Sequence, residues 1–325
     1  MTPQDRADAC QMLAADKRRL GLPIDEVRRI AAVLAEKWGI TMPLPMEDWG
    51  DRLTEFAGTE LAAEYWELHE EQALRYASDA PVPLKLETAF YDILADERIS
   101  GHVHSQKRTE ILDAGCLLVR LVRELSIAGP ILDVGCHIGY HADILARETS
   151  ATVRGIDLSA KAIEVAQPKT RGCPRLLFAA GGLDQHAHAE AYEFIYAVRS
   201  VELDKASARQ ISHALKPGGV AAILTKGEPD SSQRARRAIR AARLGWGFSD
   251  VVGGWVGDGR GYEANPVLVL IKDGSQLIPA DFVEQAKSVW DKYFKDYANA
   301  AETPWEEKTQ AHSRGQWLAS QATRH

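Results

Sequence analysis

The chain has 325 residues, a length that indicates about two domains or one large domain with additions. With 45% hydrophobic and 26% charged residues, the composition is that of a globular protein and excludes wholesale disorder and collagen-like repeats. The net charge of −7 provides no general attraction to nucleic acid or to an anionic membrane.

The sequence shows no sign of a membrane span or a secretion signal. Apolar runs such as 267–271 are far shorter than the ~20 residues that span a bilayer. The first residues lack the basic, apolar and small-residue order of a signal peptide. The 4 cysteines are scattered and form no CxxC pair, which is typical of reduced thiols. We therefore expect a mildly acidic cytoplasmic protein with no membrane partner.

The first hundred residues have apolar positions at the three- and four-residue spacing of helices. Thr2 and Pro3 are typical of a helix start and Gly21 of its end, and a second helix is expected between Pro23 and Gly39. Further helices are expected at 46–56, 60–76, 86–96 and 106–125, with breaks at the prolines of 43–45 and 79–83.

From residue 130 onwards, short β-branched runs alternate with helical segments. Strands are expected near 131–134, 152–156, 175–178, 193–198, 220–224, 248–252 and 267–271, and helices at 140–147, 160–166, 205–215 and 232–243. This alternation predicts a parallel sheet covered on both faces. Only the glycine-rich stretch 257–261 joins the last two strands, so they are expected to pair antiparallel. The predicted fold class is α/β: a seven-stranded, mostly parallel sheet with helices on both faces and an antiparallel last strand, plus a helical N-terminal region.

The loop after the first expected strand combines an acid with two glycines. The acid is Asp133, and Gly135 and Gly139 then open a helix. In open α/β sheets, ligands bind at the carboxyl ends of strands where the strand order reverses, and a glycine lets the backbone approach them closely. The dinucleotide pattern Gly-x-Gly-x-x-Gly does not fit, because His137 and Tyr140 occupy its second and third glycine positions.

The spacing of Asp133, Gly135 and Gly139 resembles motif I of class I S-adenosylmethionine-dependent methyltransferases, written (D/E)-x-G-x-G-x-G, with His137 in place of the middle glycine. The resemblance covers about residues 106–273. Three further landmarks follow in the order of that family: Asp157 at the end of the second strand, a fourth strand at 192–198 and the turn LKPGGV at 215–220.

The resemblance implies three parts of the chain. Residues 1–100 are expected to form a helical region for lid, substrate or oligomer contacts, with the lid itself near 86–108. Residues 101–275 are expected to form the S-adenosylmethionine-binding methyltransferase domain. Residues 276–325 are expected to form a helical C-terminal extension built on a helix at 279–297.

The resemblance also implies S-adenosyl-L-methionine as cofactor and S-adenosyl-L-homocysteine as product. Asp157 is expected to accept hydrogen bonds from both ribose hydroxyls, Leu158 to cover one adenine face, and Arg108 to bind the methionine carboxylate bidentately. The residues expected to contact the cofactor are Arg108, Asp133, Gly135, Cys136, His137, Gly139, Asp157, Leu158, Gly181, Gly182, Leu183, Ala197 and Val198.

Two of these expected contacts depart from the family pattern. After the third strand, the stretch 180–183 lacks the acid that often accepts from the adenine amino group, so backbone groups or Asp184 are expected to serve. His137 supports two interpretations. In one it is family variation that the loop tolerates because its φ is negative; in the other its imidazole hydrogen-bonds the cofactor carboxylate.

Candidate catalytic residues come from the segment before the methyltransferase domain. Tyr91, His102 and His104 are expected to orient the acceptor or to take its proton. The pairs His102/His104 and His186/His188 also have a spacing that can chelate a metal in an extended segment. No third ligand is evident nearby, so we expect exposed loop histidines and no metal.

The sequence therefore predicts a methyltransferase that attacks the cofactor methyl group with an oxygen or nitrogen of a small-molecule acceptor. Two alternatives remain: a protein or RNA methyltransferase that docks through the arginines of 232–243, and an S-adenosylmethionine-binding protein without transferase activity. The acidic charge disfavours nucleic acid as a partner, and a homo-oligomer is compatible with the sequence. Hydrolase and P-loop motifs are absent from the sequence.

Overall fold

The computed structural model describes residues 22–41, 49–77, 82–201, 204–224, 248–256 and 265–272. Several predictions concern other residues: the helix near 2–20, the arginine-rich helix 232–243, the loop 257–261 and the helix 279–297. These lie outside the described residues.

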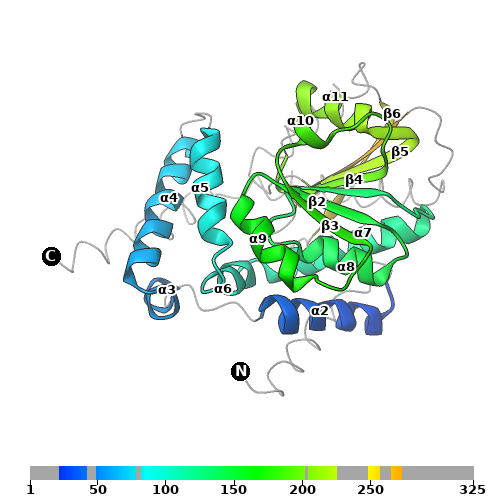
Figure 1. Ribbon diagram of the computed structural model, residues 1–325. Coiled ribbons are helices and arrows are strands. Elements are labelled where there is room, and N and C mark those ends of the chain that lie inside the picture. The colour runs from blue at the N-terminus through cyan, green and yellow to red at the C-terminus, as the bar shows by residue number, and fades with distance from the viewer. Residues whose placement is uncertain are drawn as a thin grey trace, which may run out of the picture.

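A single sheet forms the centre of the described structure, with the strand order β3-β2-β1-β4-β5-β7-β6 (Figure 1). From β3 to β5 neighbouring strands are parallel, and β7 pairs antiparallel with both β5 and β6. The expected α/β class is confirmed. The strands are β1 Ile131–Val134, β2 Val153–Asp157, β3 Leu176–Ala180, β4 Tyr192–Val198, β5 Leu215–Leu224, β6 Phe248–Val256 and β7 Asn265–Lys272.

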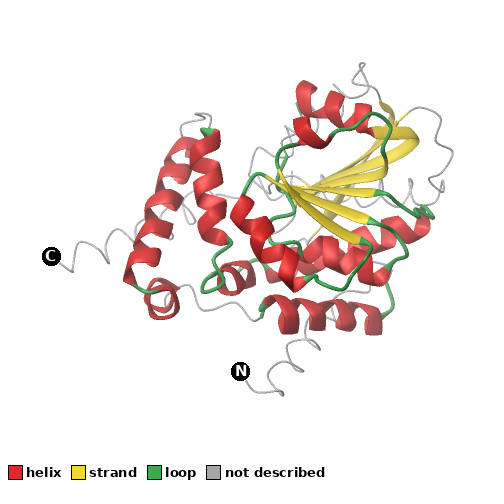
Figure 2. Cartoon of the chain, in the orientation of Figure 1, coloured by secondary structure: helices red, strands yellow, loops and turns green. Residues whose placement is uncertain are grey.

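Both faces of the sheet are covered, as alternate residues of β4 show. Phe194 and Tyr196 belong to one buried cluster and Ile195 and Ala197 to another, because successive side chains of a strand point to opposite faces. Figure 2 shows helices on either side of the strands. The first cluster contains residues of α2 (Ile24–Trp38), α7 (Arg108–Glu124) and α8 (Tyr140–Glu148), and the second contains residues of α11 (Lys205–Ala214).

A separate layer of helices stands beside the sheet. α3 (Trp49–Ala57), α4 (Thr59–Ala77), α5 (Leu84–Leu94) and α6 (Ser100–Ser105) share a third buried cluster. In Figure 1 these helices lie to one side, with α5 turned toward the sheet domain. α5 packs against α9 (Ala160–Lys169), which follows β2, and α6 against α7. This layer therefore reaches the loops at the carboxyl ends of the first strands.

The predicted end of the second helix is confirmed. Gly39 adopts φ 68° and donates its N–H to the Leu34 carbonyl, which is the glycine termination that the sequence predicts. Elsewhere the predicted elements differ. The helix expected at 106–125 begins at Arg108, after a short helix α6 that was not predicted, and α10 (Leu183–His186) was also not predicted. Helices this short carry too little apolar periodicity to be read from sequence.

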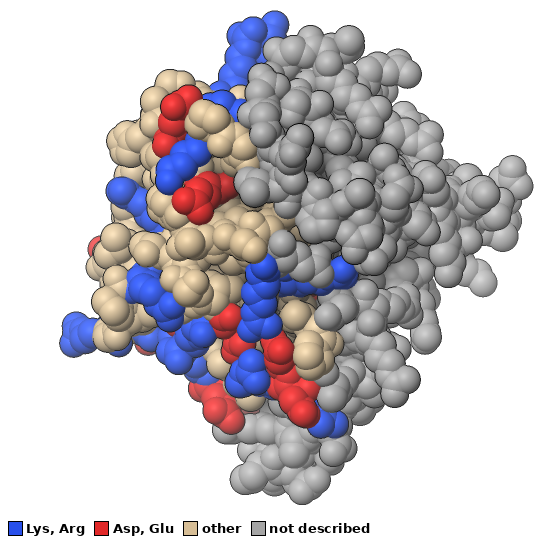
Figure 3. Space-filling model, turned by 90° about the vertical axis from the view of Figure 1, so that its right-hand side faces the viewer, with Lys and Arg blue, Asp and Glu red and all other residues tan. Residues whose placement is uncertain are grey.

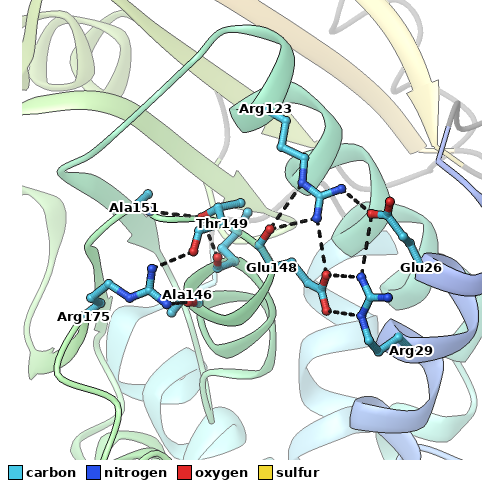
Figure 4. A network of polar contacts seen from close by, with 9 residues as sticks. Glu26, Arg29, Arg123, Ala146, Glu148, Thr149, Ala151 and Arg175 are labelled. Atoms are coloured by element: carbon cyan, nitrogen blue, oxygen red, sulfur yellow. Dashed lines mark hydrogen bonds and ion pairs between the residues drawn. The ribbon is translucent and has the colours of Figure 1, made fainter.

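A network of ion pairs joins α2 to the sheet domain (Figure 4). Glu148, at the end of α8, accepts from Arg29 Nη2 at 2.8 Å and lies 3.4 Å from Arg123 Nη2. Arg123 also pairs with Glu26 of α2. Residues of α2, α7 and α8 thus share one network, which joins α2 to the sheet domain.

Among the described residues, no helix is long and apolar enough to cross a membrane.

Candidate functional site

The expected site residues gather at one edge of the sheet, around the carboxyl ends of β1, β2 and β4. β1 lies between β2 and β4, so the chain leaves β1 toward one side of the sheet and later returns to the other. Ligands of open α/β sheets bind at such a reversal. The loops that follow β1, β2, β3 and β4 all lie at this side of the sheet, because these strands are parallel.

The packing of the protein itself requires the two motif glycines of the β1–α8 loop. Gly135 has φ 71°, and a Cβ added there would lie 2.1 Å from the Ser200 Cβ. Gly139 has φ 89°, and its Cβ would lie 2.5 Å from the Phe178 ring. The left-handed φ disfavours a side chain at each position, and the close packing leaves no room for one, so glycine is required at both. Ser200 also donates its hydroxyl to the Val134 carbonyl.

His137 occupies the middle of this loop and has φ 48°. The interpretation that this position tolerates a side chain because φ is negative is therefore wrong. Its backbone N–H donates to Asp157 Oδ2 at 2.7 Å, and its ring Nε2 lies 3.2 Å from the Tyr91 carbonyl oxygen. The imidazole is buried, and one of its nitrogens faces helix α5.

Asp157 stands at the end of β2, where the sequence places it, and is buried. Its Oδ2 accepts from the His137 N–H, and its Oδ1 accepts from the Ser159 N–H at 2.8 Å. Each carboxylate oxygen can accept a second hydrogen bond. Burial raises the pKa of this carboxyl. Asp157 thus joins the two loops and keeps acceptor capacity for a pair of hydroxyl groups.

Asp133 and Tyr196 are register partners on β1 and β4 and are both buried. The Asp133 carboxyl and the Tyr196 hydroxyl interact with each other, and neither Asp133 Oδ2 nor that hydroxyl has another hydrogen-bond partner among the described residues. Burial raises the pKa of Asp133 to about 8. Buried polar groups normally use their hydrogen-bonding capacity, so the spare capacity of this pair at the end of β1 suits a ligand that brings hydrogen-bonding groups.

The expected adenine side lies beyond β2 and β3. Leu158 follows Asp157 and is 44% exposed, so its apolar surface is available to a ligand. Gly181 has φ 134° and donates its N–H to the Asp157 carbonyl, and Gly182 precedes α10. Leu183 instead packs into the second buried cluster. Backbone groups and Leu158 therefore provide this surface.

After the carboxyl end of β4 lies an ion pair that the sequence did not predict. Ala197 is fully buried opposite Val134, while Val198 is only partly buried. The next residue, Arg199, has φ 58°, and its Nη1 lies 2.8 and 2.6 Å from the two carboxylate oxygens of Glu110. Glu110 belongs to the first turn of α7. No local pattern could reveal an ion pair across 89 positions.

Arg108 is the first residue of α7 and is buried. Cys136, next to Gly135, is also buried, and burial raises the pKa of its thiol well above the ordinary value. A Cβ at Gly155 would lie 2.8 Å from the Cys136 sulfur. The thiol thus packs against β2 and has the character of a core residue.

The structure brings two of the three catalytic candidates to the loop. The rings of Tyr91 and His104 lie 5.9 and 5.0 Å from the His137 ring. His104 Nδ1 also lies 2.5 Å from the Ser100 carbonyl oxygen, and burial lowers the pKa of His104 to about 3. His102 is different, because its exposed ring stacks on Phe56 at 3.8 Å.

A second contact ties α5 to the loops. Asp92 Oδ1 accepts from the Ser159 hydroxyl at 2.5 Å, and Ser159 is the N-cap of α9. In the part of the chain that the structure describes, no group of three or more His, Cys, Asp or Glu side chains is placed to hold a metal ion.

Residues 131–219 match the family described as "Methyltransferase domain". The match begins at β1 and ends within β5, and so covers the four loops of the site. Residues 131–219 are thus similar to a methyltransferase domain over the stretch that forms the site.

A curated relative, the "Methyltransferase GfsG" of Streptomyces halstedii, is 31% identical over 118 residues, which are 33% of this chain and 42% of the relative. The chain thus spans less than half the length of that relative. Among solved structures, the CurJ carbon methyltransferase is 13% identical, with a TM-score of 0.46 and coverage of 77% of this chain and 80% of that one. A phosphoethanolamine N-methyltransferase 2 of Haemonchus contortus, in complex with S-adenosylhomocysteine, is 15% identical, with a TM-score of 0.38 and coverage of 53% and 59%.

Proposed function

We propose that this protein transfers a methyl group from S-adenosylmethionine to an oxygen or nitrogen of a small-molecule acceptor by in-line displacement. The observation that carries the proposal is the meeting of the β1 loop and Asp157 at the point where the strand order reverses. The residues at this end of the sheet fit the cofactor: the buried pair Asp133 and Tyr196 has spare hydrogen-bonding capacity, as does Asp157, and Leu158 offers an exposed apolar side chain.

The residues of the domain have separate roles in holding the cofactor, which supplies an electrophilic methyl group when bound. Asp157 accepts from the ribose hydroxyls, and Leu158 covers adenine beside the backbone of Gly181 and Gly182. Asp133 faces the amino acid part. Arg108, at the start of α7, serves as the cation for the methionine carboxylate.

The acceptor is expected on the side of α5 and α6. Tyr91 and His104 lie next to the loop, so they are placed to orient it. With a pKa lowered to about 3, His104 is a weak base at neutral pH, and orientation is its better role. Correct alignment of two reactants can itself supply ~7–11 kcal/mol, so a strong general base is not required when the acceptor is a neutral amine or an already ionised oxygen.

A macromolecular acceptor has no specific support among the described residues. On the described part of the face in Figure 3, Lys and Arg side chains intermingle with Asp and Glu. A docking surface for nucleic acid normally has one sign of charge. A small-molecule acceptor therefore remains the proposal.

Asp157→Asn tests the cofactor site directly. The amide keeps the size of the side chain but loses the charge that strengthens hydrogen bonds from ribose, so the affinity for S-adenosylhomocysteine should fall about 10- to 100-fold. Isothermal titration calorimetry measures this, with circular dichroism to verify folding.

The matched control is Asp25→Asn, which changes an exposed acid on α2 and should leave the affinity unchanged. If the unaltered protein bound no S-adenosylhomocysteine, or if Asp157→Asn bound it equally well, the proposed function would be wrong.

A further inference from the structure

The geometry points to His137 as a positioning residue: through its two ring nitrogens it links the bound nucleoside to helix α5, so that cofactor binding and the docking of α5 stabilise one another. This inference rests on the proposed function for the identity of the ligand. It assigns to the imidazole a role that the motif glycine of the family cannot have.

The backbone of His137 is the first observation. A φ of 48° is a conformation that glycine adopts freely and that any residue with a Cβ, histidine included, adopts at some cost. Strained residues cluster at functional sites, where the surrounding structure holds them in place. Because glycine would relieve the strain, the contacts of the imidazole are the feature to explain.

The ring is held at one end by α5. Nε2 lies 3.2 Å from the Tyr91 carbonyl oxygen, and a carbonyl can only accept, so Nε2 carries the proton. Burial lowers the pKa of His137 to about 4, so the ring is neutral at physiological pH. In a neutral imidazole with its proton on Nε2, Nδ1 is an acceptor.

The other end of the ring has no hydrogen-bond partner in the part of the chain that the structure describes. The His137 side chain is buried, with the residue only 7% exposed, and Nδ1 has no hydrogen-bond partner among the described residues. A buried acceptor of this kind needs a donor. The neighbouring groups are Tyr91 of α5 and His104 of α6, whose rings lie 5.9 and 5.0 Å away. Neither hydrogen-bonds Nδ1.

The missing donor is an O–H or N–H of the bound nucleoside, either a ribose hydroxyl or the ammonium group. His137 sits between the two elements that would hold that ligand, because its own N–H donates to Asp157. A donor at Nδ1 fixes the tautomer with the proton on Nε2, and this tautomer is the one that holds the Tyr91 carbonyl. Binding at one end therefore strengthens the contact at the other.

A neighbouring contact provides an internal control. Asp92, next to Tyr91 on α5, accepts from the Ser159 hydroxyl at 2.5 Å. This contact also ties α5 to the site, but it does not involve the imidazole. Loss of the Asp92 contact should loosen α5 without removing the response of α5 to the ligand.

The test is hydrogen–deuterium exchange of α5 amides, with and without S-adenosylhomocysteine, in the full-length protein. Binding should slow their exchange in the unaltered protein. His137→Gly removes both the backbone strain and the Nε2–H donor to the Tyr91 carbonyl. The Asn side chain of His137→Asn tolerates the left-handed φ but is too short to reach that carbonyl. Both should accelerate α5 exchange about tenfold without ligand and lose most of the ligand effect.

Two variants separate positioning from general stability. His137→Gln extends a donor N–H to about the place of Nε2 and should restore slow exchange. Asp92→Ala, which removes the acceptor of the Ser159 hydroxyl, should accelerate exchange yet keep the ligand effect. If His137→Gly kept both the slow exchange and the full ligand effect, the inference would be overturned. The ligand-free comparison holds even if the protein binds no S-adenosylhomocysteine, so failure of the proposed function is recognised separately.

A nitrogen NMR spectrum of the histidine side chains identifies the donor. Addition of S-adenosylhomocysteine should shift the His137 Nδ1 resonance in the direction of an accepted hydrogen bond. The same shift with 5′-methylthioadenosine, which keeps the ribose and lacks the amino acid, assigns the donor to a ribose hydroxyl. A shift with S-adenosylhomocysteine alone assigns it to the ammonium group. An unshifted Nδ1 with both ligands bound contradicts the inference.

Discussion

Single residues at the β1 edge serve the packing of the protein as much as its ligand. Gly139 shows this, because its missing side chain makes room for Phe178 of β3. Gly172 has a similar backbone, with φ 92° against 89° for Gly139, but nothing lies within 4 Å of its Cβ position. The two glycines therefore separate the backbone effect from the packing effect.

Alanine substitution at these two glycines should have unequal effects. Gly172→Ala should lower the free energy of unfolding by about 1–2 kcal/mol, the ordinary effect of a side chain at positive φ. Gly139→Ala adds a methyl group 2.5 Å from a ring carbon and should lower it by a further ~1–3 kcal/mol. Urea denaturation followed by circular dichroism measures both values. Equal values would show that Phe178 moves aside freely.

At the scale of elements, α2 is joined to the sheet domain by charge as well as by apolar packing. Asp143 of α8 is completely buried and accepts from Lys37 Nζ at 2.6 Å, Trp38 Nε1 at 3.3 Å and Arg147 Nε at 2.9 Å. Burial lowers the pKa of Lys37 even beside this acid. A buried charge depends on all its partners, so this carboxylate is the point at which α2 can be released.

Asp143→Asn should weaken the attachment of α2. The variant leaves two cations beside a neutral amide, and breaking such a buried pair lowers the free energy of unfolding by about 3 kcal/mol or more. The control is Glu55→Gln, which breaks an exposed pair with Arg52 and should change it by less than about 0.5 kcal/mol. Chemical denaturation compares the two variants. A small effect of Asp143→Asn would mean that apolar contacts alone hold α2.

At the scale of the whole molecule, buried histidines make stability depend on pH. Burial lowers the pKa of His104 to about 3 and those of His137 and His141 to about 4, against about 6.5 in an unfolded chain. Between pH 6.5 and 4 the unfolded chain therefore binds more protons at these positions than the folded one. Their contribution to stability is complete above pH 6.5 and is lost as the pH falls toward 4.

Asp133 acts in the opposite direction. Its pKa of about 8 in the folded protein lies above the unfolded value of about 3.9, so over the same range the folded protein holds one proton that the unfolded chain lacks. Asp157, whose pKa burial also raises, acts in the same direction as Asp133, and the three histidines outweigh these two carboxyls. The free energy of unfolding should thus fall between pH 6.5 and 4.5, by about 1.4 kcal/mol per pH unit for each proton in excess.

Urea denaturation at pH 7 and pH 5 tests this balance. Asp133→Asn removes the opposing proton and should make the decline steeper, while His141→Gln should make it shallower. A free energy of unfolding that rises toward pH 5 would show that the carboxyls dominate.

The sequence predicted the parts of the site that depend on local order. The acid and glycines after β1, Asp157 at the end of β2, and Gly39 at the end of α2 follow from strand and helix patterns, because such patterns repeat within a few residues. The α/β class and the helical N-terminal residues follow for the same reason.

Only the tertiary structure decided which side chains meet. The Glu110–Arg199 pair, the approach of Ser200 to Gly135 and the contact between His137 and α5 join residues far apart in the chain, and His102 turned to Phe56 while His104 turned to His137. Even the sign of φ at His137 was decided by its neighbours. Local patterns fix where strands and helices begin, but contacts between loops depend on how those elements pack, and packing is a property of the whole chain.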